Sequence, residues 1–264
     1  MAGMETVPSQ RVRAGDVLGL PVNLLTWTDA LDCIFEWARG RRSSSVCLCN
    51  VHSIVTALQL PDHAQALRAA DLVVADGAPV AWLLRRTGQH DQTRICGPDL
   101  MWACCREAAR FRAPIFLYGA TYPTLQQLEL RLHAAFPEIN IVGAIAPPFW
   151  KLAAAEDLAT VEAINGSGAA IVWVGLGCPK QEAWMHAHRG RVQAVMIGVG
   201  AAFDFHAGVV RRAPRWMQRS GLEWLHRILQ DPHRLAGRYL VSNTLFIIAV
   251  LRHALRRRAG VDNG

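Results

Sequence analysis

Short apolar runs alternate with helical patterns along the first 210 residues, and this alternation constrains the fold more than any other feature. The runs typical of buried strands are 45–50, 71–76, 114–120, 139–145, 169–177 and 194–203. The segments between them place apolar residues at helical spacing, as in "PDLMWACCREAARF" (98–111). Such alternation is typical of a parallel sheet with helices on both faces. We therefore expect an α/β fold with a Rossmann-like, mostly parallel sheet.

Positive charge is concentrated at the C-terminal end of the chain. Residues 211–264 contain 11 arginines against three acidic residues, a net charge of +8, whereas residues 1–210 contain 17 basic and 18 acidic residues. This asymmetry indicates an anionic partner such as phosphate, a membrane surface or nucleic acid. We expect an α/β catalytic domain over 1–210 and a basic helical appendage over 211–264.

The segment 221–258 predicts two or more helices around Pro232. Its apolar run "LFIIAVL" (245–251) is by itself too short to span a bilayer, which needs about 20 residues. Arginines follow this run, a pattern that fits a helix lying in the membrane interface. A helix docked on its own protein or on a sister subunit fits the same pattern, so membrane association and a homo-oligomer both stay open.

The cysteines and the N-terminus indicate a cytoplasmic protein. The seven cysteines lie mostly inside apolar runs, as reduced core thiols do. Cys47 and Cys49, like the adjacent Cys104 and Cys105, lack the partner spacing of a zinc site. The N-terminal residues lack the apolar core of a secretory signal.

Polar residues follow several of the predicted strands, where parallel sheets bind their ligands. Asn50 ends the first run, and Asp76 with Gly77 ends the second, in "VVADGAP". Asp76 admits two roles. As a helix N-cap it would contribute about 1 kcal/mol, and as a general base it would accept a proton from a sugar or alcohol hydroxyl. The two roles are compatible.

A second candidate loop is "GLGCPKQE" (175–182). Gly175 and Gly177 allow a tight turn close to a ligand, and Pro179 suits the first position of a helix. Amides at that helix start favour an anion such as a diphosphate, and Lys180 and Gln181 add a charge and an amide. The loop is neither a Walker loop nor a full dinucleotide fingerprint. The structural alternative is a simple strand–helix turn with a surface Lys-Gln-Glu.

The remaining polar motifs are weaker. Arg94 in "RICGPDLMW" either binds phosphate or pairs with a carboxylate. The chain contains no D-x-D, so a carboxylate pair that holds Mg²⁺ on a nucleotide-sugar is not supported, and we expect no metal or other cofactor. His52 and His206 follow strand-like runs, but lone histidines more often satisfy local hydrogen bonds than act in catalysis.

Seven stretches occur in the order seen in the WecG/TagA/CpsF glycosyltransferases, glycosyltransferase family 26. They are "CNVHSIVTA", "ADLVVADGAPVAW", "RICGPDLM", "FLYGA", "VGLGCPKQEAWM", "GVGAAFDFHAG" and "RRAPRWMQRSGLEWLHRILQDPHRLAGRY". The chain resembles this family from about residue 17 to 250. The resemblance implies inverting transfer from a UDP-sugar to a polyprenyl-diphosphate-linked saccharide at the inner face of the plasma membrane. The product would be a precursor of a surface polysaccharide.

The resemblance also implies the site residues. Asp76 matches the proposed catalytic base, and Asn50 and Gln181 match the family's polar positions. A threonine common in the family is Leu48 here, so any role of that hydroxyl is in doubt. The arginines thought to close over the diphosphate map to Arg227, Arg234 and Arg238. The other expected substrate-binding residues are Gly77, Arg94, Gly97, Asp99, Gly175, Gly177, Lys180 and Glu182.

The chemistry agrees with such a transfer. One carboxylate suffices as the base, and an inverting displacement needs no second carboxylate as nucleophile. Arginines and helix-terminal amides replace a metal at the departing UDP.

Two other classes of function fit parts of the sequence. A Rossmann-type nucleotide-binding oxidoreductase is disfavoured, because no early G-x-G-x-x-G opens the first strand–helix unit. A non-catalytic adaptor that uses the basic tail on a membrane or a nucleic acid is the third hypothesis, although we expect no nucleic-acid partner. None of the motifs identifies the donor sugar.

Overall fold

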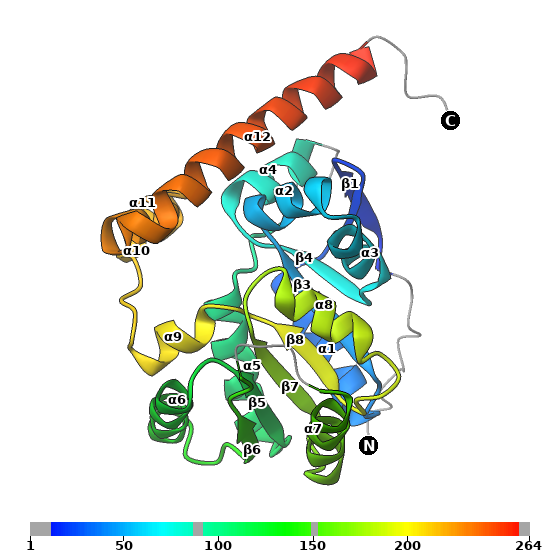
Figure 1. Cartoon of the computed structure of the whole chain (residues 1–264), viewed down its shortest axis with the longest axis vertical. Helices are drawn as coiled ribbons and strands as arrows, with labels where there is room; N and C mark the ends of the chain where they lie inside the picture. Colours follow the sequence, from blue (N-terminus) through cyan, green and yellow to red (C-terminus); the bar gives the residue numbers. More distant parts are fainter. Residues whose placement is uncertain (1–11, 87–91, 149–152, 259–264) are drawn as a thin grey trace, which may run out of the picture.

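The computed structural model describes residues 12–86, 92–148 and 153–258. Its centre is a six-stranded parallel sheet with helices on both sides (Figure 1). The strand order is β4-β3-β8-β7-β5-β6. These strands are β3 (Ser44–Cys49), β4 (Leu72–Ala75), β5 (Ile115–Gly119), β6 (Ile141–Ile145), β7 (Ile171–Gly175) and β8 (Val195–Gly198). The expected α/β, Rossmann-like fold is confirmed.

Each predicted apolar run contains one of these strands, but two details differ from the prediction. The run 194–203 is a strand only to Gly198, because helix α9 (Ala202–Ala207) begins within its last residues. A two-stranded antiparallel hairpin of β1 (Ala14–Val17) and β2 (Leu20–Asn23) was not predicted. The hairpin packs beside the sheet through Val17, Leu20 and Val22.

The helices divide between the two faces of the sheet. One face carries α1 (Trp27–Arg39), α5 (Gly97–Phe111), α6 (Tyr122–Ala135) and α9. The other face carries α2 (Val51–Gln59), α3 (Pro61–Ala69), α4 (Ala78–Arg86), α7 (Ala154–Gly166) and α8 (Lys180–Ala187). Each helix turns its apolar side to the sheet, which is the layer arrangement that lets both elements bury their apolar surface.

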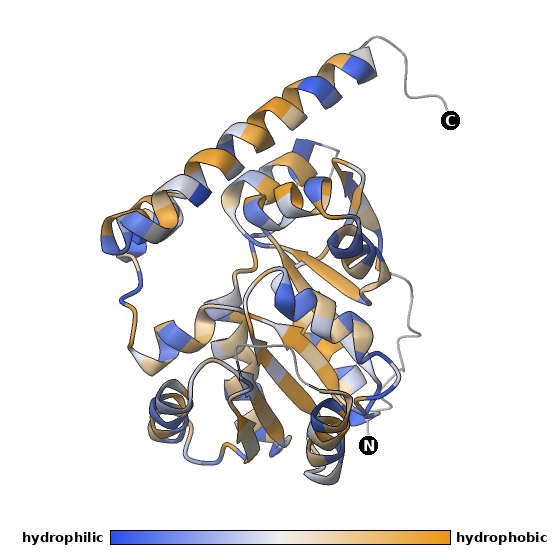
Figure 2. Cartoon of the chain, viewed as in Figure 1, coloured by the Kyte–Doolittle hydropathy of each residue, from blue (hydrophilic) through white to orange (hydrophobic). Residues whose placement is uncertain are grey.

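The strands are apolar along their whole length because both faces of the sheet are covered. In β7, Ile171 and Trp173 belong to the core on one face, and Val172 and Val174 belong to the core on the other. All four are fully buried. Figure 2 shows the same continuous apolar character along the central strands. The alternation follows from the two-residue period of a strand.

The C-terminal segment forms three further helices, α10 (Arg215–Arg219), α11 (Glu223–Gln230) and α12 (Pro232–Arg258). The predicted break at Pro232 is confirmed. The boundary expected near residue 210 falls between α9 and α10. Helix α12 packs against α2 and α11, and its C-terminal part extends beyond the α/β domain (Figure 1).

The apolar run 245–251 was judged too short to span a membrane, but it lies in one long helix. Leu235–Arg256 comprises 22 residues that are long and apolar enough to cross a bilayer, by length and composition alone. Little of this stretch is buried inside the protein. Length therefore does not decide between a spanning helix and one that lies on a surface.

Candidate active site

The polar residues expected at strand ends lie along one edge of the sheet. Asp76 follows β4, Asn50 follows β3, Gly200 lies just beyond β8, and Gly175 ends β7. These four strands are consecutive neighbours in the sheet. Because neighbouring strands lie about 4.8 Å apart, the residues form a short row at the carboxyl ends of the strands. This edge is the usual ligand site of such sheets.

Asn50 and Asp76 form the centre of this row. Asn50 is the N-cap of α2, and its Oδ1 accepts the Ser53 backbone N–H at 3.0 Å. The other end of the same amide, Nδ2, donates to Asp76 Oδ2 at 3.3 Å. The cap thus fixes which end of the Asn50 amide faces the carboxylate. Gly77 follows with a φ of 92°, in the left-handed region that favours glycine.

The environment of Asp76 suits a proton acceptor. Burial raises the pKa of its carboxyl most strongly and the charge of Glu223 raises it further, while the charge of Arg94, the hydrogen bond from Asn50 and the charge of Arg227 act in the opposite direction. The net shift of the pKa is upward, towards the range in which a general base works well near neutral pH. Among the described residues, the carboxylate accepts its hydrogen bond from Asn50 and none from the first turn of α4. These contacts therefore do not support the alternative role of Asp76 as the N-cap of α4.

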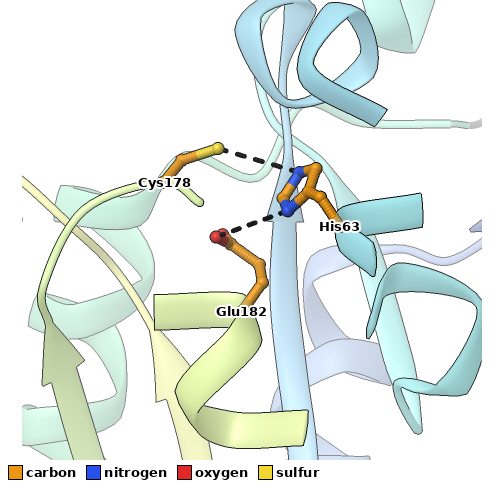
Figure 3. A group of neighbouring side chains, drawn as sticks. All are labelled: His63, Cys178 and Glu182. Carbon is orange, nitrogen blue, oxygen red and sulfur yellow. Dashed lines mark hydrogen bonds and ion pairs between the residues drawn. The ribbon is translucent and has the colours of Figure 1, made fainter. Parts of the chain in front are cut away.

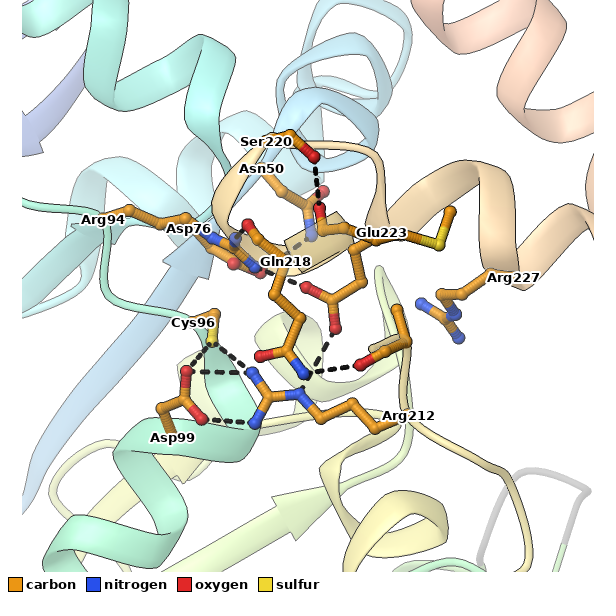
Figure 4. Close-up of polar contacts among 12 residues, drawn as sticks. Asn50, Asp76, Arg94, Cys96, Asp99, Arg212, Gln218, Ser220, Glu223 and Arg227 are labelled. Atoms are coloured by element: carbon orange, nitrogen blue, oxygen red, sulfur yellow. Dashed lines mark hydrogen bonds and ion pairs between the residues drawn. The ribbon is translucent and has the colours of Figure 1, made fainter. Parts of the chain in front are cut away.

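Arg94 and Asp99 are both held by the C-terminal segment (Figure 4). Arg94 Nη2 lies 2.6 Å from Glu223 Oε2, and its Nη1 donates to the Gln218 carbonyl at 2.8 Å. Asp99 is bound at both carboxylate oxygens by Arg212. Arg212 Nε also lies 3.4 Å from Glu223 Oε1. These contacts bring residues 94–99, which lead into the first turn of α5, and the 212–223 segment together beside Asp76.

Gly97 has a packing role at the start of α5. A Cβ there would lie 2.8 Å from Leu48 Cδ1 and 3.1 Å from the Val199 carbonyl oxygen. Leu48, which replaces the family's threonine, is buried in β3 against this glycine. The side chain at this strand end is therefore part of the core rather than an open hydroxyl.

The "GLGCPKQE" loop forms the expected strand–helix turn. A Cβ on Gly175 would lie 2.8 Å from the Phe203 ring, and Gly177 has a φ of 79°. Pro179 stands at the N-cap rather than at the first helical position, because α8 begins at Lys180. Lys180 is exposed.

Gln181 and Glu182 are buried, so the alternative of a surface Lys-Gln-Glu is wrong for these two residues. Gln181 Nε2 donates to Glu182 Oε1 at 2.8 Å. The Gln181 amide lies beneath the β8–α9 turn, where a Cβ on Gly198 would approach its Nε2 to 3.1 Å. Both side chains are therefore covered by the protein and are not exposed at the carboxyl ends of the strands.

Behind Glu182 lies a buried polar cluster of His63, Cys178 and Glu182 (Figure 3). Cys178 Sγ lies 3.7 Å from His63 Nε2, whereas Glu182 Oε2 lies 4.0 Å from His63 Nδ1. One candidate ligand atom from each of the three residues lies within 4.8 Å of the others, although Cys178 and Glu182 are nearest to different nitrogens of the His63 ring. Burial raises the pKa of Glu182 and of Cys178 and lowers the pKa of His63, which favours the neutral form of all three. As they stand, the three side chains form a neutral polar cluster.

The expected C-terminal arginines lie on α11 and α12. Arg227 stacks over the Phe205 ring at 5.4 Å and faces the Tyr239 hydroxyl at 3.5 Å. Arg238 stacks over the Tyr239 ring at 5.6 Å. The side chain of Arg234 lies outside the described residues. Of the two whose side chains are described, Arg227 is the one whose charge acts on the pKa of Asp76.

Both histidines considered from the sequence make local contacts. His52 Nδ1 lies 3.3 Å from Ser242 Oγ on α12, beside a cavity of about 350 Å³ between α2 and α12. His206 Nε2 lies 2.8 Å from the Pro98 carbonyl oxygen, and its ring stacks on Trp102. These contacts agree with the structural role expected for lone histidines.

Arg212 and Glu223 are the important residues that sequence reasoning missed. Both were counted only as part of the charge of the tail. The available signal was their position in the two conspicuous stretches "RRAPRW" and "GLEWLHR". Nothing in either stretch indicated that the partners would be Asp99 and Arg94.

The site is therefore a partly buried carboxylate at the strand-end edge of a Rossmann-like sheet, with the positive charges of Arg94 and Arg227 acting on it. The sequence model described as "Glycosyl transferase WecG/TagA/CpsF family" matches residues 15–260, nearly the whole chain. The chain therefore belongs to the WecG/TagA/CpsF family of glycosyltransferases, which act in cell-surface polysaccharide synthesis. Membership supports a transferase with a sugar-nucleotide donor and a lipid-linked acceptor in general terms, rather than an oxidoreductase or an adaptor.

Proposed function

We propose that this protein is an inverting, metal-independent glycosyltransferase that moves a sugar from a UDP-sugar to a polyprenyl-diphosphate-linked saccharide. The observation that carries the proposal is the partly buried Asp76 carboxylate, oriented by Asn50 and lying within the field of Arg94 and Arg227. The side chains around it combine a proton acceptor with positive charge, which are the two requirements of transfer from a nucleotide diphosphate.

In the proposed reaction, Asp76 accepts the proton of the acceptor hydroxyl as that oxygen attacks the anomeric carbon. The bond from this carbon to the UDP oxygen breaks with inversion, and UDP leaves with the bonding electrons. Asn50 Nδ2 holds Oδ2 of Asp76, so Oδ1 is the oxygen directed to the proton. One carboxylate completes this chemistry, because no covalent intermediate is formed.

The leaving diphosphate requires positive charge that is already in place. Arg94 and Arg227 supply it near Asp76, and Lys180 and Arg238 extend it towards α8 and α12. Preorganised cations of this kind stabilise developing negative charge without a metal ion. We propose that Gly77, Gly175 and Gly177 allow the backbone to approach the ligand closely. The buried side chains of Gln181 and Glu182 support the adjacent part of the site from within the protein.

The proposal places the enzyme at the inner face of the plasma membrane. The exposed apolar side chains of α12 are Leu240, Val241, Ile247, Ile248, Leu251 and Leu255. Exposed Arg252 and Arg256 lie on the same helix, and this mixture suits an interfacial helix on an anionic leaflet. Association with the membrane would bring the strand-end edge to a lipid-linked acceptor. A sister subunit on the same apolar surface is the competing arrangement.

A panel of UDP-sugars tested with a short-chain lipid-diphosphate-linked saccharide examines the proposal directly. Mass spectrometry should show the acceptor gaining one sugar residue with one donor, and NMR of the product should show an inverted anomeric centre. The matched control is Asp76→Asn in the same assay. If no donor gives transfer and a nicotinamide cofactor instead changes the protein fluorescence, the oxidoreductase hypothesis replaces this one.

A further inference from the structure

The C-terminal segment is fastened to the α/β domain by a network of charged groups close to Asp76 (Figure 4). Arg212 holds both oxygens of Asp99, and its Nη2 lies 3.2 Å from Cys96 Sγ. Glu223 then links Arg212 to Arg94 through its two carboxylate oxygens. The network joins residues more than 100 positions apart in the sequence.

The ion pairs of Glu223 are more shielded from solvent than ordinary surface pairs, whereas the side chain of Asp99 is 48% exposed. The side chains of Arg94, Glu223 and Arg212 are only 24%, 17% and 23% exposed. The Arg212–Asp99 contact is bidentate, the geometry that makes arginine–carboxylate pairs both strong and specific. Although burial of Asp99 opposes it, hydrogen bonds from Arg212 and Cys96 hold the pKa of this carboxyl below its usual value.

The network also determines where Arg94 can point. The guanidinium of Arg94 is held from the C-terminal side by the Glu223 carboxylate and the Gln218 carbonyl. Among the charged groups that act on Asp76, Arg94 has the largest effect on the pKa of that carboxyl. If the 212–223 segment moved away, Arg94 would lose both of these partners.

We propose that Arg212 and Glu223 are positioning residues, which dock the C-terminal segment on residues 94–99 at the start of α5 and thereby hold Arg94 beside the catalytic carboxylate. The inference rests on the proposed function for its effect on turnover, but the docking itself is independent of any activity. Asp99 is the residue of the α/β domain to which Arg212 is bound. It therefore acts through Arg212 and Arg94, and does not need to touch a substrate.

Hydrogen–deuterium exchange on the full chain tests the docking. Arg212→Asp puts a third carboxylate beside Asp99 and Glu223, and amides of residues 211–231 should exchange faster. The double variant Arg212→Asp with Asp99→Arg should restore part of the protection, since it re-forms that pair with reversed charges while the carboxylate at position 212 still faces Glu223. The matched control is Arg211→Asp, because the Arg211 side chain is exposed and makes no ion pair with the described residues. Unchanged exchange in Arg212→Asp would overturn the proposal.

The pH dependence of kcat/KM tests the positioning role separately. Arg212 is not among the groups whose charge acts on Asp76, so Arg212→Gln has no direct effect on the base. Release of Arg94 and displacement of Arg227 raise the pKa of Asp76, whereas displacement of Glu223 lowers it. Because Arg94 has the largest effect of these charges, the acid limb of the profile moves to higher pH. Arg212→Lys should lie between the wild type and Arg212→Gln. An unmoved limb, with normal folding, contradicts the positioning role.

Failure of the proposed function gives a different pattern of results. In that case the wild-type chain shows no sugar transfer with any donor, while the exchange experiment still reports whether Arg212 docks the segment. A wild type that transfers sugar, combined with an Arg212→Asp variant whose exchange and pH profile match those of the wild type, refutes the positioning inference alone.

Discussion

Replacement of Asp76 by asparagine separates the proposed catalytic role of this residue from its structural role. Asparagine has nearly the same shape, and its amide oxygen can accept the existing hydrogen bond from Asn50. The substitution removes the proton acceptor and leaves the volume unchanged. Loss of a general base typically reduces the rate by about 10²–10⁴-fold, so kcat for sugar transfer should fall by that order. Binding of UDP should persist, since the arginines remain.

The structure also predicts the effect of this substitution on stability. Burial raises the pKa of Asp76 in the folded protein, so folding favours the protonated carboxyl. The stability contributed by the protonated form is present at low pH and is lost as pH rises through the unfolded and then the folded pKa. At neutral pH the ionised carboxylate therefore destabilises the fold, and the neutral asparagine removes this effect. The melting temperature of Asp76→Asn should equal or exceed that of the wild type.

Three measurements on the same preparation complete the experiment: turnover by mass spectrometry, UDP binding by calorimetry and thermal melting. Asp71→Asn is the matched control. Asp71 immediately precedes β4, so it lies at the amino-terminal end of the strand that Asp76 follows, and it pairs with Arg42 and Arg189. That variant should keep its turnover and lose a little stability. Near-wild-type turnover of Asp76→Asn would refute the assignment of the base. A lower melting temperature would show that the carboxylate stabilises the fold.

Four further predictions follow from the site and the appendage. EDTA should leave turnover largely intact, since arginines take the place of a metal ion at the diphosphate. Arg227→Ala and Arg238→Ala should each reduce turnover by up to about 10²-fold without unfolding the α/β domain. Leu251→Glu with Leu255→Glu should weaken binding to vesicles that contain anionic lipid, as measured by sedimentation. Gly119→Ala should destabilise the fold by about 1–3 kcal/mol in chemical denaturation, because the added Cβ would lie 2.5 Å from the Gly175 backbone.

Each of these predictions has a contradicting outcome. Activity lost in EDTA and restored by Mg²⁺ would reject the metal-free chemistry. Unchanged kinetics of both arginine variants with a soluble acceptor analogue would reject their role at the diphosphate. Vesicle binding that survives the two glutamates, together with a change in oligomeric state, would assign the apolar surface of α12 to a sister subunit. An unaltered denaturation midpoint for the glycine variant would show that β5 and β7 can separate locally.

Periodicity made the fold predictable. The six apolar runs were each long enough for one strand, and the helical spacing between them implied crossover helices and hence a parallel sheet. The same reasoning placed Asp76 and Asn50 at strand ends, and the structure brings them into hydrogen-bond contact. The hairpin of β1 and β2 was missed because four-residue strands carry too little pattern to distinguish them from a loop.

Burial of polar side chains was much harder to predict. Gln181 and Glu182 follow an exposed lysine and have the composition of a surface turn, yet both are buried, Gln181 beneath the β8–α9 turn and Glu182 beside His63. Local composition does not indicate which face of an eight-residue helix such as α8 will be covered. That depends on the neighbouring strand end, which is contributed by a different part of the chain.

The sequence by itself determined the class of fold, the edge of the sheet that carries the site and the family to which the chain belongs. These follow from local periodicity and from short motifs, which are properties of neighbouring residues. Only the tertiary structure decided which charges meet. Arg94 pairs with Glu223, 129 positions away, and Arg212 pairs with Asp99, 113 positions away. A charge carries no record of its partner in the sequence, because Coulomb attraction depends on distance in space, and the packing of the whole chain sets that distance.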